Sequence, residues 1–312
     1  AAPATTDSLK LIIGAGGIYA AFLYYGSLQE DVFRYTSATG EKFKYAWFLQ
    51  LVEALSNVLV GGMGLMLSGA THGLPQKTFA ITGVSQVCAK AFTSLSLASG
   101  VSFPIVTLAK SGKMIPVMVG SLLLGGASYT LREYLSVLAI IAGTAAVSMG
   151  KKSAAGENSL IGLSFIALSL TCDGITGGLQ KKMMKESAAV GVKPKPYDFM
   201  FWTNLYMGMA ALVISVFLGE FQNGIEYCIQ NTALFEKILK FGVCSAIGQS
   251  FIFFTIANFD PLVCTTVTTT RKVFSVLLSI ILKGHSLTNQ GWGGLALASG
   301  GILSELLDKK KK

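Results

Sequence analysis

The sequence predicts an all-α integral membrane protein with ten transmembrane helices, arranged as two inverted five-helix repeats. Three observations predict this fold class: an apolar composition, ten apolar stretches of membrane-spanning length, and an internal repeat. Of the 312 residues, 52% are hydrophobic and only 13% are charged, whereas a soluble domain carries about 25% charged residues. This composition excludes a soluble two-domain enzyme.

Apolar stretches of about 20 residues, long enough to cross ~30 Å of hydrocarbon, occur ten times along the chain. The candidate spans are 9–28, 45–67, 78–99, 103–124, 131–149, 159–180, 198–218, 236–257, 261–282 and 288–307. The first has no basic n-region and no small-residue cleavage site, so we interpret it as a span and not as a signal peptide. The longest connections lie near 29–44, 181–197 and 219–235, which leaves no room for a separate soluble domain.

The distribution of charge predicts the topology. An even number of spans places both termini on one side, and that side collects the larger share of lysine and arginine, including Lys309 to Lys312. The positive-inside rule therefore favours cytosolic termini. The net charge of +9 does not indicate nucleic-acid binding, because no soluble domain is present to display a basic surface.

The cysteines and histidines do not form a recognisable site. The five cysteines have no CxxC pair and no metal-ligand spacing, and four lie in apolar runs, where cysteine behaves as a small hydrophobe. The two histidines, His72 and His285, lie in polar connections. We therefore expect no metal site, no cofactor and no catalytic residues.

The internal repeat predicts how the spans are related. A shift of 158 positions superposes several residues: Gly126 on Gly284, Thr130 on Thr288, Gly143 on Gly301 and Lys113 on Arg271. Each half, 1–150 and 151–312, then holds five spans, and the second half ends in the basic tail. Because five is odd, the two halves cross the membrane in opposite directions, as in many secondary transporters. The halves together form one transport domain.

Positive charges inside the predicted spans indicate a binding cavity. Lys110 and Lys113 lie three residues apart in the fourth span and share a helix face, and the ninth span carries Arg271 and Lys272 near its middle. Each charge costs about 2.5–3.5 kcal/mol at the bilayer centre unless it faces water or a partner. Four cations therefore predict a water-filled cavity that receives an anion. Lysine and arginine together suit a substrate with two or more phosphates.

Other polar residues in the spans have two interpretations each. Glu53 and Asp173 either couple protons or pair with buried lysines, and pairing is the favoured interpretation. Gln249 either contacts a base or ribose edge of a ligand or makes a hydrogen bond between helices. Lys90 and Lys240 are interpreted as helix-end residues whose ammonium groups reach the membrane interface, so they are left out of the site.

Five segments resemble the nucleotide-sugar transporter family of the drug/metabolite transporter superfamily. Residues 108–118 resemble its fourth-helix signature, and 248–253 and 268–272 resemble its eighth and ninth helices. Residues 24–30 and 169–174 resemble parts of its first and sixth helices. The resemblance implies ten helices, inverted repeats, alternating access and no enzymatic activity. It also implies that substrate is bound by the following residues: Lys110, Lys113, Arg271, Lys272, Gln249 and Glu30.

Two branches of this family share the fourth-helix signature. The first is the endoplasmic-reticulum branch called UDP-galactose transporter-like, whose animal member is also described as an ATP/ADP exchanger. The second carries 3′-phosphoadenosine-5′-phosphosulfate and typically has glutamine at the position of Lys272, so this sequence favours the first. The resemblance implies antiport of UDP-galactose or UDP-glucose against UMP, with ATP/ADP exchange as the alternative.

The C-terminal tail is consistent with the same compartment. Lys309 and Lys310 are the fourth and third residues from the end, and they resemble a dilysine retrieval signal of reticulum membrane proteins. We therefore expect a location in the reticulum membrane and recognition of these lysines by coat protein. An ordinary positive-inside flank would have the same composition.

Overall fold

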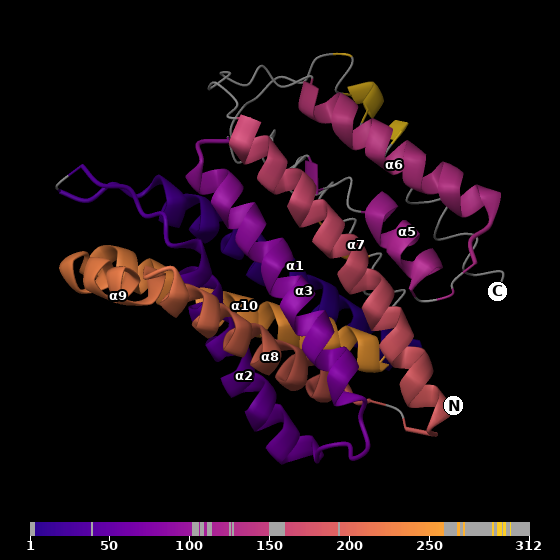
Figure 1. Cartoon of the computed structure of the whole chain (residues 1–312). Coiled ribbons are helices and arrows are strands. Elements are labelled where there is room, and N and C mark those ends of the chain that lie inside the picture. Colours follow the sequence, from indigo (N-terminus) through magenta and orange to yellow (C-terminus); the bar gives the residue numbers. More distant parts are fainter. Residues whose placement is uncertain are drawn as a thin grey trace.

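A computed structural model describes the greater part of the chain. The described residues are 4–38, 40–101, 106, 109–110, 114–124, 126, 128–149, 160–192, 194–258, 267–268, 271, 289, 292–294, 296–297 and 300. Their helices are α1 (Ala4–Arg34), α2 (Ala46–Ser68), α3 (Gln76–Ala98), α5 (Met114–Leu123), α6 (Leu131–Met149), α7 (Leu160–Ala189), α8 (Pro196–Phe217), α9 (Glu220–Gln230) and α10 (Thr232–Asn258). The described part is thus helical, as predicted (Figure 1).

Several described helices are long and apolar enough to cross a membrane. Within the described residues these are Leu9–Arg34 of α1, and α2, α7 and α8 over their whole lengths. They confirm that the chain is a helical membrane protein with several spans. Most of the candidate spans 261–282 and 288–307 lies outside the described residues, as do Lys309 to Lys312.

Three predicted connections contain more helix than expected. Helix α1 continues to Arg34, α7 continues to Ala189, and α9 occupies most of the predicted connection 219–235. The end of α7 is rich in lysine, methionine, glutamate and alanine, which are strong helix formers. A helix satisfies its own backbone hydrogen bonds, so such segments continue as helix beyond the apolar stretch.

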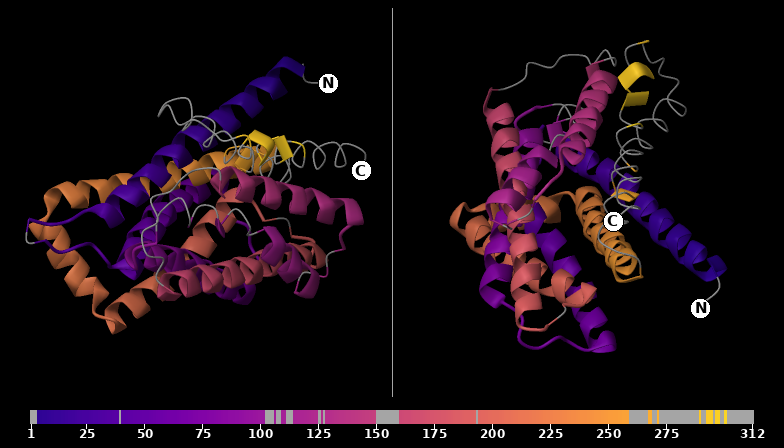
Figure 2. Two further views of the ribbon diagram at one scale, coloured as in Figure 1. Left: turned by 90° about the horizontal axis from the view of Figure 1, so that it is seen from above. Right: turned by 90° about the vertical axis from the view of Figure 1, so that its right-hand side faces the viewer.

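The helices pack so that segments far apart in the sequence lie side by side. Helix α3 packs against α7 and α8, α10 packs against α1 and α2, and α2 packs against α8. Figure 1 shows α9 at one end of this bundle, remote from α5 and α6. In Figure 2 the first turns of α1 extend past the other described helices.

Glycines allow one especially close helix contact, between α5 and α7. A Cβ atom on Gly120 would collide with the backbone carbonyl of Gly174, and one on Gly178 would collide with the carbonyl of Gly120. Small residues at such crossings let helix backbones approach and gain dispersion energy, which drives association in lipid.

The bundle is apolar on the outside and holds both apolar and polar side chains inside. Leu59 on α2 and Val213 on α8 are each 69% exposed, as expected for side chains that contact lipid tails. The buried polar side chains include Gln50, Glu53, Asn57, Thr82, Ser94, Ser169, Asn204 and Ser245. Because a polar group in hydrocarbon must find a partner, these residues mark the part of the interior that is held by hydrogen bonds and ion pairs.

Helix α9 fixes one end of α2. The Glu220 carboxylate accepts hydrogen bonds from the backbone N–H groups of Trp47 (2.7 Å) and Phe48 (3.3 Å), which have no partner within their own helix. Burial raises the pKa of Glu220, and the two N–H groups offset part of that shift. This acceptor comes from a residue more than 170 positions away, so it links the two halves of the chain.

Candidate functional site

An ion pair lies inside the bundle between α2 and α3. Lys90 Nζ is 2.6 Å from Glu53 Oε1, and the two side chains are 26% and 1% exposed. The hydroxyl of Tyr25 on α1 donates to both carboxylate oxygens at 3.2 Å. The hydroxyl of Ser245 on α10 donates to Glu53 Oε1 at 2.7 Å. Four helices therefore converge on one carboxylate.

This geometry settles the interpretation of Glu53 and corrects that of Lys90. Glu53 pairs with a lysine of the interior, which was its favoured interpretation. The placement of Lys90 at the membrane interface is wrong, because Lys90 lies well inside α3 and its ammonium contacts a buried carboxylate. Lys240 lies two turns into α10, and its side chain is 57% exposed and lies 3.5 Å from Glu236, so its ammonium is on the outside of the bundle.

A chain of amide side chains extends from this ion pair into the second half of the protein. Asn57 Nδ2 donates to Asn204 Oδ1 at 3.0 Å and to Ser245 Oγ at 3.4 Å. Asn204 Nδ2 in turn donates to Gln249 Oε1 at 3.2 Å. Gln249 therefore makes a hydrogen bond between helices, one of its two interpretations, and it does so in the same polar region as Glu53.

A second ion pair lies on another side of α3. Lys110 Nζ is 2.5 Å from Asp173 Oδ2 on α7, with side chains 22% and 19% exposed. Lys110 also donates to Ser169 Oγ at 2.8 Å, and Ser169 donates to the carbonyl of Ala89. Ala89 precedes Lys90, so both ion pairs lie at the same level of α3. Asp173 thus also pairs with a lysine, as favoured.

Arg271, from the predicted ninth span, lies against α1. Its guanidinium carbon lies 5.3 Å from the centre of the Phe22 ring, a distance at which a cation and an aromatic face attract each other. The Phe22 ring packs edge-on against Tyr25 at 5.8 Å, and Tyr25 is within electrostatic range of Arg271. Tyr25, which contacts Glu53, therefore also lies near Arg271.

The remaining predicted site residues are Glu30, Lys113 and Lys272. Glu30 lies near the end of α1, and its Oε1 is 2.9 Å from Arg34 Nη2 in an i,i+4 pair. Lys113 and Lys272 lie outside the described residues. The sequence analysis did not place Asn57, Asn204 or Ser245 in the site.

It also left out Lys90. This lysine could have been predicted as the partner of Glu53, because it lies in the span that follows the one with Glu53.

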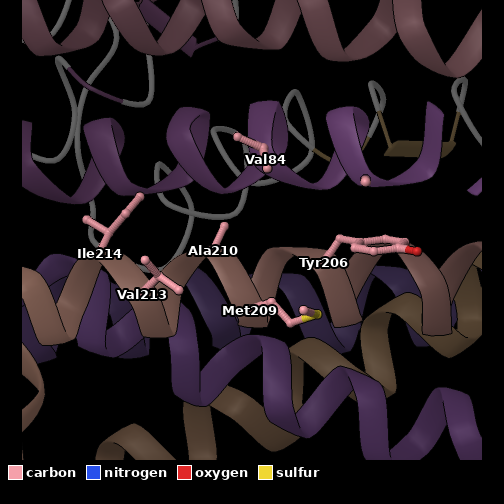
Figure 3. A pocket seen from close by; sticks show the side chains of 7 residues that line it. Val84, Tyr206, Met209, Ala210, Val213 and Ile214 are labelled. Carbon is pink, nitrogen blue, oxygen red and sulfur yellow. The ribbon is translucent and has the colours of Figure 1, made fainter. Parts of the chain in front are cut away.

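A separate apolar hollow lies between α3 and α8 (Figure 3). It is lined by Ala80, Val84, Tyr206, Met209, Ala210, Val213 and Ile214. None of these seven residues carries a charge, and Val84, Met209 and Val213 are exposed on the outside of the bundle. This hollow lacks the chemistry to bind an anion and faces lipid, so the polar interior remains the candidate site.

Apolar membrane-spanning helices that bury ion pairs are typical of polytopic membrane proteins that move solutes. Residues 10–309 match the UAA transporter family, and the chain belongs to that family. This confirms the resemblance carried by the five sequence segments and makes the protein a transporter, not an enzyme.

Curated relatives match over nearly their full lengths. A Drosophila melanogaster protein named Solute carrier family 35 member B1 homolog is 32% identical, over 97% of this chain and 91% of the relative. The Arabidopsis thaliana UDP-galactose/UDP-glucose transporter 3 is 31% identical, over 97% and 94%. The Gallus gallus Solute carrier family 35 member B1 is 32% identical, over 95% and 92%.

Several solved structures share the fold. A crystal structure among them is 14% identical in sequence and superposes with a TM-score of 0.61, covering 94% of this chain and 98% of the other. This likeness extends over nearly the whole chain and concerns the fold alone.

Proposed function

We propose that this protein is a nucleotide-sugar antiporter of the endoplasmic-reticulum membrane, which imports UDP-galactose or UDP-glucose into the lumen in exchange for UMP. Support comes from the name of the Arabidopsis thaliana relative, a UDP-galactose/UDP-glucose transporter. Both termini are then cytosolic, as the positive-inside rule favours.

The observation that carries the proposal is the presence of cations beside polar groups inside the bundle. Lys110 of the fourth span pairs with Asp173, and Arg271 of the ninth span lies over Phe22 and near Tyr25, which contacts Glu53. Arginine adds a planar fork that matches two phosphate oxygens, whereas lysine acts as a point charge. Lys113 and Lys272 are proposed to complete the phosphate site, and Gln249 and Glu30 to contact other parts of the substrate.

Helix packing supports two inverted repeats of five helices each. The repeat pairs α1 with α7, α2 with α8, and α3 with α10. Exchanging each helix for its counterpart converts the α3–α7 contact into α10–α1 and the α3–α8 contact into α10–α2, and all four contacts occur. The α2–α8 contact maps onto itself. Alternating access then follows from rocking one half against the other around a central site.

A binding panel tests the substrate class. Purified protein in detergent is heated with UDP-galactose, UDP-glucose, UMP, ATP, ADP or 3′-phosphoadenosine-5′-phosphosulfate, because a ligand that binds the folded state raises the melting temperature. The proposal expects uridine nucleotides to give the largest shifts. Larger shifts with ATP and ADP would favour ATP/ADP exchange, the alternative for this branch, and no shift with any nucleotide would refute the proposed substrate class.

A further inference from the structure

The Glu53–Lys90 ion pair lies in the same interior as Arg271 and has no part in the phosphate site proposed above. We propose that Lys90 is a further anion-binding residue of the transport site and that Glu53 is its positioning residue. The carboxylate holds the ammonium in place until a phosphate of the substrate competes for it. This inference rests on the proposed function, since it adds a cation to that same site.

The exposed part of Lys90 faces the inside of the bundle. The outward side of α3 carries Ile81 and Val84, which are 46% and 45% exposed. Lys90 follows Ile81 by nine residues, a rotation of about 180° around a helix of 3.6 residues per turn. The side chain therefore points away from lipid, and its exposed surface is accessible from the interior.

Lys90 and Arg271 lie near different members of one hydrogen-bonded pair, Glu53 and Tyr25. The Lys90 ammonium contacts the Glu53 carboxylate from α3, and Tyr25 donates to the same carboxylate from α1. Arg271 lies near Tyr25 and over the ring of Phe22. We therefore place Lys90 in the same site as an anion that binds beside Arg271.

The two side chains of the ion pair differ in conformational freedom. Glu53 is fully buried and also accepts hydrogen bonds from Tyr25 and Ser245, so its position is fixed. Lys90 is partly exposed and has three N–H donors on a flexible stem. Among the described residues one protein acceptor, Glu53, binds its ammonium, which leaves donors for a phosphate oxygen.

A neighbouring polar group shows that this face of α3 is suited to a polar occupant. Gln86 precedes Lys90 by four residues and so lies on the same face, one turn away. Its buried side-chain oxygen has no hydrogen-bond partner within the described part of the chain. A buried polar atom without a partner is costly, and a ligand or water in the interior would supply one.

Three variants separate an anion-binding lysine from a purely structural ion pair. Dissociation constants for UDP-galactose, UMP, ADP and ATP are measured by calorimetry on the full chain in detergent, after a melting curve confirms folding. Glu53→Gln frees the ammonium, so the nucleotide that binds the wild-type protein should bind several-fold more tightly. In Glu53→Gln/Lys90→Gln the cation is gone, and affinity should fall at least about tenfold. Lys90→Arg keeps a cation and should stay within about threefold of the wild-type protein.

An anion-binding Lys90 predicts tighter nucleotide binding in Glu53→Gln and weaker binding in the double variant, whereas a purely structural ion pair predicts neither change. Wild-type affinity in the neutral double variant would overturn the inference and leave the proposed function intact. If Glu53→Gln does not fold, the comparison of the double variant with Lys90→Arg decides in the same way. Lys240→Gln, which removes an exposed lysine next to Glu236, is the matched control and should bind like the wild-type protein. A wild-type protein that binds no nucleotide would overturn the proposed function and this inference together.

Discussion

Breaking the Lys110–Asp173 ion pair should destabilise the protein, and neutralising both partners should restore most of the loss. Lys110→Gln leaves the Asp173 carboxylate without the ammonium that lies 2.5 Å away. A one-sided break costs about 3–5 kcal/mol for a buried pair, and an exposed pair contributes about 0–1 kcal/mol. With exposures of 22% and 19%, we expect the free energy of unfolding to fall by about 1–3 kcal/mol.

The double variant Lys110→Met/Asp173→Leu separates this stability effect from binding. It buries no uncompensated charge, because two apolar side chains of similar volume replace the pair. Thermal unfolding in detergent should give a low melting temperature for Lys110→Gln and a recovery of at least half of that loss in the double variant. Nucleotide binding should stay weak in both variants, since the proposed phosphate ligand is absent. A single variant that melts like the wild-type protein, or a double variant that melts as low as the single, would refute this reasoning.

Three further predictions concern other parts of the fold. Glu220→Ala removes the acceptor for two N–H groups of α2 and should lower the free energy of unfolding by about 1 kcal/mol. The pKa of Glu220 is raised in the folded protein, so the contribution of Glu220 to the free energy of unfolding should decline as pH rises through that pKa. Glu220→Gln should make the free energy of unfolding less dependent on pH in this range. Burial raises the pKa of the Cys228 thiol to about 11, so maleimide at neutral pH should label Cys228 after denaturation but not before, as mass spectrometry would show. Gly120→Leu should lower the melting temperature or prevent a monodisperse preparation because it separates α5 from α7, whereas Gly16→Ala, which meets open space, should not.

The sequence alone predicts the fold class and the pairing of the interior acids for a simple physical reason. Lipid requires long apolar helices, and a carboxylate such as Glu53 or Asp173 in such a helix must find a cation. The identity of the cation is harder to predict. Lys90 and Glu53 are 37 residues apart, and only the packing of α2 against α3 shows that they meet.

Helix ends and side-chain directions could not be predicted from hydropathy either. The charged end of α7 is polar enough to suggest a connection, yet its residues favour helix. Gln249 has the same sequence context whether it faces a ligand or Asn204, and the direction it takes depends on how α8 and α10 pack. Glu30 finds a local partner one turn away, which a motif match does not reveal.

Counter-exchange in proteoliposomes tests the central claim most directly. Vesicles that contain the purified protein are preloaded with UMP or left empty, and uptake of labelled UDP-galactose is followed over time. Antiport by alternating access predicts that preloading accelerates uptake severalfold. It also predicts that Arg271→Ala, folded and inserted like the wild-type protein, loses most of this uptake. Equal uptake into loaded and empty vesicles, or full exchange by Arg271→Ala, would contradict the account.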